Sequence, residues 1–147
     1  MIEFTLTRTT SAPIESVFDK LTDHRAYKDM SPLRISELDR PGDSEPNGLG
    51  AIRRVGLVGP TQTEEVTVFE RPTRFGYTLR SGLPVRDHVG IVDLSRTSSG
   101  GTDISYRVRS TPTLPVPGFG LLLGLVLKKG IGDLLNGIVR AAESASP

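Results

Sequence analysis

Apolar and polar residues alternate over much of the chain, and this alternation predicts short β-strands. Near the start, Ile2, Phe4 and Leu6 alternate with polar neighbours, which is the pattern of a half-buried strand over residues 2–8. Five later segments show strand-like composition between turn residues: 51–58, 61–70, 74–81, 86–96 and 103–110. Because their connections are too short for a helical crossover, neighbouring strands should pair antiparallel as a meander.

Two short helices are expected between the first strand and this meander. Within residues 11–23, apolar side chains recur at i, i+3, i+4 and i+7: Ile14, Val17, Phe18 and Leu21. Pro13 suits the first position of a helix, and Glu15 suits its positive end. Residues 24–30 predict a second short helix, which ends at Ser31 because a residue before proline avoids helical angles.

Residues 33–39 alternate in a way that leaves their orientation open. Leu33 and Ile35 fall on one side of the alternation and Leu38 on the other. The sequence PGDSEPNG at 41–48 is strong turn chemistry. A loop and a hairpin therefore belong between the helices and the meander.

Residues 118–144 predict a long helix that packs on the sheet. Its second half carries an apolar stripe: Leu127, Ile131, Leu134 and Ile138. Each interior glycine of this segment costs about 0.5–1 kcal/mol relative to alanine, so packing must hold the helix. Its first half is apolar all round, which predicts cover on several sides. The cover is a ligand, the loop at 112–117, or a second subunit of a homodimer.

The longest apolar stretch, residues 114–127, is interrupted by prolines and glycines. It is shorter than the roughly 20 residues that a helix needs to span a bilayer. We therefore expect a buried helix start or a pocket wall, and no stable membrane insertion. Contact with a membrane surface is the alternative.

Length and composition narrow the class of protein. A chain of 147 residues suits a single domain spanning 1–147. A net charge of +1 gives no field that attracts nucleic acid, and the arginines at 53, 54, 71, 74, 80 and 86 are expected on a solvated outer face. The absence of cysteine and of a visible signal peptide favours a cytoplasmic location.

The order of predicted elements resembles the START-like helix-grip (SRPBCC) superfamily over essentially the whole chain. Four stretches are similar to its polyketide cyclase/dehydrase-like branch: TSAPIESVFDKLTD, GLGAIRRVG, EEVTVFERPTRFGYTLRSGLPVRDHVG and GGTDISYRV. The resemblance implies an α+β fold, in which a curved antiparallel sheet of six to seven strands carries the long helix across its concave face. It also implies a cavity between sheet and helix for an apolar or aromatic small molecule, such as a lipid or a polyketide.

Polar side chains in phase with inward apolar ones are the candidates to line such a cavity. Phe75 and Tyr77 share one face of their strand, so Tyr77 is expected to point inward. His88 shares the parity of Val92 and Leu94, and we favour this set as the inward one over the opposite parity. A partly exposed histidine near a strand start is the alternative reading of His88.

Two charged residues are further candidates. Glu64 shares a face with Val66 and Val68, and Arg53 shares one with Val55 and Leu57. If both charges point inward they should pair, because buried charges need partners, and they would bind a carboxylate or enolate oxygen. The alternative is a solvated cross-strand salt bridge.

The rest of the predicted lining is less polar. Tyr106, in phase with Ile104 and Val108, either adds a hydroxyl to the pocket or is an ordinary core tyrosine. Leu123 and Leu127 of the last helix complete the predicted wall.

No motif points to a cofactor. The only histidines are His24 and His88, and together with the absence of cysteine they offer no metal-ligand spacing. Neither a phosphate-binding loop nor a nucleophile elbow is present. We expect no metal, no other cofactor and no nucleic-acid partner.

Three hypotheses follow. The leading one is a protein that binds a hydrophobic or aromatic small molecule. The second is a cyclase or dehydratase, in which His88 moves a proton and Tyr77 or Arg53 stabilises a developing oxyanion. The third is an interaction module whose segment 118–127 meets a protein or a membrane surface.

Overall fold

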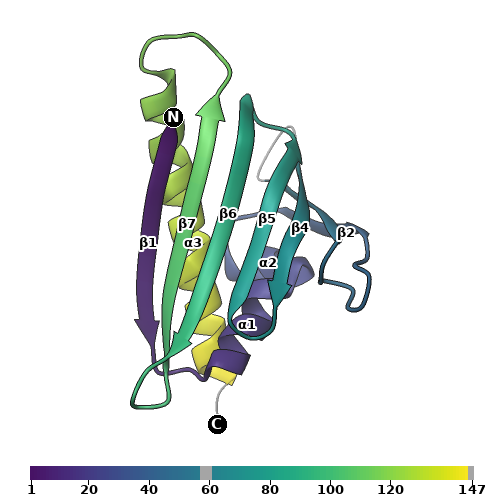
Figure 1. Ribbon diagram of the computed structural model, residues 1–147, viewed down its shortest axis with the longest axis vertical. Helices are drawn as coiled ribbons and strands as arrows, with labels where there is room; N and C mark the ends of the chain where they lie inside the picture. The colour runs from purple at the N-terminus through teal and green to yellow at the C-terminus, as the bar shows by residue number, and fades with distance from the viewer. Residues whose placement is uncertain (57–60, 146–147) are drawn as a thin grey trace.

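The computed structural model describes residues 1–56 and 61–145 (Figure 1). A strand and three short helical segments come first: β1 (Ile2–Thr10), α1 (Ile14–Thr22), η1 (His24–Ala26) and α2 (Tyr27–Met30). Six strands follow: β2 (Ile35–Arg40), β3 (Ile52–Gly56), β4 (Gln62–Glu70), β5 (Arg74–Ser81), β6 (Val85–Arg96) and β7 (Thr102–Pro112). The long helix α3 (Phe119–Ala145) ends the described chain.

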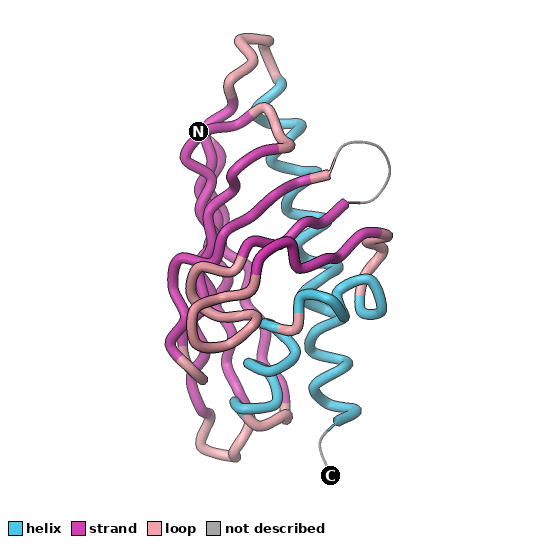
Figure 2. The backbone as a smooth tube through the Cα atoms, turned by 90° about the vertical axis from the view of Figure 1, so that its right-hand side faces the viewer, coloured by secondary structure: helices cyan, strands magenta, loops and turns pink. Residues whose placement is uncertain are grey.

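The strands form one antiparallel sheet in the order β1-β7-β6-β5-β4-β3-β2. Strands β2 to β7 pair with their sequence neighbours, and β1 joins at the edge by pairing Ile2 with Ser110 and Thr10 with Thr102. All the helices lie on one face of this sheet, and α3 runs along it (Figure 2). The predicted α+β helix-grip fold is thus confirmed, with seven strands.

The amphipathic pattern of α1 produces the buried face that it predicted. Ile14, Val17, Phe18 and Leu21 are all buried. Pro13 lies one residue before the helix, with extended backbone angles, so it caps α1 from outside its first turn.

The second half of α3 packs into the core. Leu135 and Ile138 are fully buried, and a side chain on Gly137 would collide with the backbone carbonyl of Met30. Only glycine therefore allows α3 to approach the end of α2 so closely.

The first half of α3 is open on one side, so the loop at 112–117 does not supply the predicted cover, while cover by a ligand or a second subunit stays a prediction. Gly120 faces Pro112 and Gly124 faces Ile2, so one side of these turns packs on the sheet. On the other side Leu121 is 73% exposed, and Leu125 is 60% exposed. The sheet covers only one face of a helix, and no other described segment covers the opposite face.

Strand β4 also departs from its predicted alternation. The register of β4 against β5 shifts between Val66 and Val68, which marks a bulge. Beyond it, Val68 lies beside Gly76 and away from the face that carries Glu64 and Val66, so the predicted common face is wrong for Val68. Leu57, expected in phase with Arg53, lies outside the described residues.

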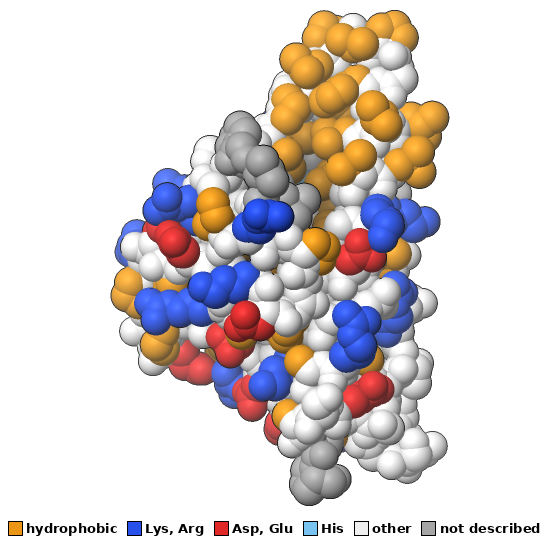
Figure 3. Space-filling model, turned by 180° about the vertical axis from the view of Figure 1, so that it is seen from behind, with side chains coloured by type: hydrophobic (Ala, Val, Ile, Leu, Met, Phe, Trp, Pro, Cys, Tyr) orange, Lys and Arg blue, Asp and Glu red, His pale blue; other side chains and the backbone are white. Residues whose placement is uncertain are grey.

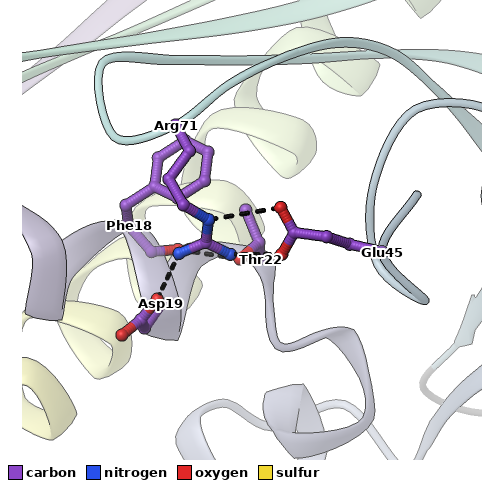
Figure 4. Close-up of polar contacts among 5 residues, drawn as sticks. All are labelled: Phe18, Asp19, Thr22, Glu45 and Arg71. Carbon is purple, nitrogen blue, oxygen red and sulfur yellow. Dashed lines mark hydrogen bonds and ion pairs between the residues drawn. The ribbon is translucent and has the colours of Figure 1, made fainter. Parts of the chain in front are cut away.

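An arginine joins three parts of the chain at the end of the sheet near α1 (Figure 4). Arg71, in the β4–β5 turn, donates hydrogen bonds to Asp19 of α1 and to both carboxylate oxygens of Glu45 in the β2–β3 loop. Its guanidinium carbon also lies 4.9 Å from the ring centre of Phe18. We call this set the Arg71 clip.

Candidate ligand pocket

A pocket of about 270 Å³ lies between the sheet and α3. Strands β3 to β7 supply one wall, and α3 supplies the other through Val126, Leu127, Gly130, Ile131 and Leu134. Tyr27, Ser31, Pro32 and Leu33 close one side. Pro32, Val126 and Gly130 are exposed, so the pocket opens between α3 and the segment that follows α2.

A buried ion pair forms part of the sheet wall. Arg53 of β3 faces Glu64 of β4 in the strand register, and Arg53 Nε donates to Glu64 Oε1 at 2.8 Å. Their side chains are only 3% and 9% exposed. The solvated salt bridge is therefore wrong for this pair, and Arg53 does not belong to the outer face that was expected for all six arginines.

Aromatic rings enclose the Arg53 guanidinium. Its central carbon lies 4.8 Å from the ring centre of Tyr77 and 5.3 Å from those of Tyr27 and Phe75. Arg53 Nη1 also donates to the Tyr27 hydroxyl, which in turn donates to the Leu21 carbonyl. Cation–π contact and hydrogen bonding together compensate for much of the desolvation of the guanidinium.

Two tyrosines share a hydrogen bond beside this pair. The hydroxyl oxygens of Tyr77 (β5) and Tyr106 (β7) are 2.7 Å apart, and both side chains are buried. Gly90 of β6 lies between their strands, and a side chain there would overlap the Tyr77 ring. Gly90 thus makes the space that lets the Tyr77 ring lie flat against β6.

His88 points into the pocket from β6. Asp87 before it has a positive φ of 54°, and the register of β6 against β7 shifts between Arg86 and Val89. This bulge precedes an inward set that contains His88, Val92 and Leu94, as favoured from the parity. His88 Nδ1 lies 3.1 Å from the hydroxyl of buried Ser110.

Burial sets the protonation of these groups. Desolvation is the largest influence on Arg53 and opposes its charge, but the charge of Glu64 and the neighbouring tyrosines outweigh it and raise the Arg53 pKa. Desolvation raises the pKa values of Tyr77 and Tyr106, so both remain phenols. Desolvation also lowers the pKa of His88, against a smaller opposing effect of Glu64. Desolvation likewise raises the pKa of Tyr27. At neutral pH the pocket therefore holds one ion pair, three phenols and a neutral imidazole.

Six of the eight residues predicted for the lining lie on the wall of this pocket: Arg53, Glu64, Tyr77, His88, Tyr106 and Leu127. Phe75 lies behind the wall, where its ring contacts Tyr77 and His24. Leu123 is half-buried one turn before Leu127, outside the lining. The roles of all eight in ligand binding or catalysis remain predictions.

The sequence reasoning missed the contribution of the second short helix. Tyr27 closes one side of the pocket and accepts a hydrogen bond from Arg53. A polar aromatic residue on a helix beside the predicted sheet was the available signal. Pro32 was used only to end the second short helix, and Leu33 only as the start of an alternating segment of open orientation.

His24 occupies the core behind the pocket. Its side chain is fully buried between the rings of Tyr27 and Phe75, and neither ring nitrogen has a hydrogen-bond partner among the described residues. Desolvation, helped by the charge of Arg53, lowers its pKa well below the ordinary value. His24 is therefore a neutral core residue.

A wider hollow of about 680 Å³ lies over β1, β7 and β6. Its lining includes Glu3, Asp87, Arg107 and Arg109, which are exposed charged side chains. Ser110 is the one buried polar residue of its lining, and its hydroxyl lies beside His88 of the inner pocket, so we place the candidate site in the inner pocket.

The described parts of the chain hold neither a metal-binding cluster nor a membrane-spanning helix. No cluster of three or more histidine, cysteine, aspartate or glutamate side chains is arranged to hold a metal ion there. Within residues 1–56 and 61–145, no helix combines the length and apolarity needed to cross a membrane.

An antiparallel sheet with a long helix along one face and a pocket between them defines a helix-grip protein. The chain belongs to the family described as polyketide cyclase / dehydrase and lipid transport, which matches residues 1–143. No curated protein matches the sequence.

Solved structures share this fold at low sequence identity. A conserved protein from Geobacillus kaustophilus is 19% identical, with a TM-score of 0.75 over 99% of this chain and 98% of its own. Norcoclaurine synthase from Thalictrum flavum, in complex with dopamine and hydroxybenzaldehyde, is 12% identical, with a TM-score of 0.76 over 99% and 88%. Ara h 8.0201 is 17% identical, with a TM-score of 0.76 over 97% of each chain. At these identities the likeness concerns the fold.

Proposed function

We propose that the protein binds a small apolar or aromatic molecule with a neutral hydrogen-bonding group in the pocket between the sheet and α3. The observation that carries this proposal is the buried set of Arg53, Glu64, Tyr77 and Tyr106 in an otherwise largely apolar pocket. Pockets of this composition are typical of small-molecule sites, where a few polar groups fix orientation.

The ion pair favours an uncharged ligand. Arg53 is already neutralised by Glu64, so the pair adds no net charge to the pocket. A ligand carboxylate placed beside Arg53 would also lie near the Glu64 carboxylate and would lose its hydration. The carboxylate ligand expected from the sequence is therefore less favourable here than a hydroxyl or carbonyl group.

The tyrosine pair offers a donor to such a group. One phenol donates to the other across the 2.7 Å contact, and the accepting phenol retains its own proton. No described residue accepts that second proton. A ligand carbonyl or hydroxyl oxygen is a fitting acceptor.

The volume favours a compact ligand. At about 270 Å³ the pocket lies at the small end of ligand sites, which span roughly 300–1,000 Å³. A molecule of one or two rings fits this space better than a long-chain lipid. The presence of dopamine and hydroxybenzaldehyde in the norcoclaurine synthase structure supports the same size class.

The proposal is tested by a substitution on α3 that blocks the opening of the pocket. A side chain on Gly130 meets no atom within 4 Å at its first carbon, and Gly130 lines the opening. Gly130→Trp should therefore fill the opening without disturbing the helix. We expect it to weaken binding of the neutral two-ring probe 1-aminonaphthalene, measured by fluorescence titration, by at least about tenfold.

Lys128→Trp is the matched control, since Lys128 is exposed on the same helix and does not line the pocket. It should leave the affinity within about twofold of the wild type. Equal loss in both variants, or binding that Gly130→Trp leaves intact, would place the probe elsewhere and overturn the proposal. Native mass spectrometry of the protein as purified identifies any ligand retained from the cell.

A second candidate function is enzymatic, and the neutral His88 favours it. A neutral imidazole on a pocket wall, with Nδ1 held near Ser110, is able to accept a proton from a bound substrate. We would follow cyclisation of a synthetic triketide thioester by liquid chromatography. Catalysis should fall at least about 100-fold in His88→Ala. If the wild-type rate equals that of buffer, the catalytic candidate fails for this substrate class while the binding proposal stands.

A further inference from the structure

One end of the molecule exposes a cluster of large apolar side chains (Figure 3). It comprises the β7–α3 loop and the first two turns of α3, and we call it the apolar tip: Leu114, Val116, Leu121, Leu122, Leu125 and Val126. Each of these side chains is 48% exposed or more. A contiguous apolar surface of this kind marks an interaction site more often than isolated exposed leucines do.

The charge pattern of the tip is that of a segment that enters a lipid surface. Residues 111–127 contain no charged side chain, and Lys128 and Lys129 follow immediately. Lys129 is paired with Asp133, whereas Lys128 makes no ion pair with the described residues. Lysines at this boundary are placed to reach lipid phosphates while the leucines enter the acyl region.

The change from apolar to cationic runs along the axis of α3. Leu121, Leu125 and Lys128 follow one another on the exposed side of the helix. An amphipathic helix that lies flat on a membrane has its polar and apolar residues on opposite sides, along its whole length. The axial order found here fits a helix whose first turns enter end-on, to a depth of about 10 Å at 1.5 Å per residue.

The shape of this end argues for a lipid surface over a second copy of the chain. The β7–α3 loop lies at the extremity of the longest axis and protrudes beyond the ends of the strands (Figure 1). A narrow protruding end offers little area to an identical rigid end, while a stable dimer buries roughly 800 Å² per partner. A fluid bilayer surface surrounds such an end on all sides.

The tip also adjoins the pocket opening. Val126 belongs to both, since it is exposed on the tip and lines the pocket. Gly130, one turn further along α3, is another exposed residue of the opening. A tip seated in lipid would therefore bring the opening to the level of the headgroups.

We propose that the apolar tip docks the protein reversibly on a lipid surface, with α3 entering end-on. Docking itself does not depend on a pocket ligand. Its consequence, which rests on the proposed function, is that an apolar ligand passes between the membrane and the pocket without crossing bulk water.

The experiment is flotation with vesicles of phosphatidylcholine, alone or mixed with phosphatidylglycerol. The wild type should float with both, and about fivefold more strongly with the anionic mixture, a preference that Lys128→Gln removes. Leu125→Asp should weaken binding at least about tenfold. Leu49→Asp is the matched control, because Leu49 is similarly exposed in the β2–β3 loop and should leave binding within about twofold.

Several results would overturn the docking. The first is that the wild type does not float with vesicles. The second is that Leu125→Asp and Leu49→Asp lose vesicle binding equally. The third is that light scattering shows a dimer that Leu125→Asp dissociates, while vesicles bind neither the wild type nor the variant. Gly130→Trp, which blocks the pocket, should still float at least as strongly as the wild type, because tryptophan is favoured at the level of the headgroups. Failure of the proposed ligand binding is therefore distinguishable from failure of docking.

Discussion

Arg53 and Arg71 make the same kinds of contact in opposite surroundings. Arg53 pairs with Glu64 and lies against the rings of Tyr27, Phe75 and Tyr77. The Arg71 clip pairs its arginine with Asp19 and Glu45 and places it over Phe18 and Phe69. The Arg53 side chain is 3% exposed, while that of Arg71 is 41% exposed.

This difference decides how much each contact matters. Water replaces a lost partner of Arg71, so its ion pairs stabilise the fold only modestly. Water does not replace Glu64 in the same way, because the pair lies inside the protein, where an unpaired charge is very unfavourable. The buried pair is also the one that lines the candidate pocket, where a neutral combination of charges suits the proposed uncharged ligand.

The largest effect is expected from removing the charge of Glu64. Glu64→Gln keeps the side-chain size but leaves Arg53 buried without a counter-ion, which should lower the free energy of unfolding by about 3 kcal/mol. Urea denaturation followed by circular dichroism measures this value. The matched control is Glu65→Gln on the same strand, whose partner Arg80 is 51% exposed. It should change stability by about 0.5 kcal/mol or less.

Replacing both partners separates charge from packing. In Arg53→Met/Glu64→Leu no charge is buried, and most of the lost stability should return. If the double variant is as unstable as Glu64→Gln, the loss comes from disturbed packing, and the unpaired charge is not its cause.

Lowering the pH should have a smaller effect on stability. This effect arises at His24, beside the rings that surround Arg53. His24 contacts Tyr27 and Phe75, two of the rings around Arg53, and burial lowers its pKa well below the ordinary value. Below about pH 6.5 the unfolded chain binds a proton at His24 that the folded chain does not. The contribution of neutral His24 to the free energy of unfolding is therefore fully present above that pH. It should fall by about 1 kcal/mol as the pH is lowered from 7.5 to 5.5.

His24→Leu isolates this contribution, since other titrating groups are common to both proteins. The variant should lose about 1 kcal/mol less than the wild type over the same pH interval in urea titrations. Identical pH dependence in the two proteins would mean that His24 binds its proton in the folded state as readily as in the unfolded state.

The two arginines also show which features of the fold the sequence predicts and which it does not. Periodicity is local, so it placed the strands and the buried face of α1 correctly. It was also right that Val55 shares the face of Arg53 and that Val66 shares the face of Glu64, but wrong for Val68. It did not determine which face is covered, because that depends on where α3 packs, and it placed Arg53 and Arg71 alike on the outer face.

Other misses have equally specific causes. The bulge in β4 turned Val68 to the other face, and no glycine or proline in that stretch signals it. Tyr27 joins the pocket through the packing of α2, a long-range arrangement. An all-apolar segment predicted cover for the start of α3, yet the same composition suits exposure to lipid. The sequence shows that the start of α3 is apolar, but only the structure shows that these side chains are exposed.

An effect about as small as that of pH is expected at the Arg71 clip. Arg71→Ala removes two exposed ion pairs and the contacts with Phe18 and Phe69, which should lower the free energy of unfolding by about 1 kcal/mol. Part of this difference should disappear in high salt, because salt screens exposed charges. Arg80→Ala, which removes one exposed pair and no ring contact, should cost about 0.5 kcal/mol or less. A loss for Arg71→Ala as large as that for Glu64→Gln would show that burial does not set the difference between the two arginines.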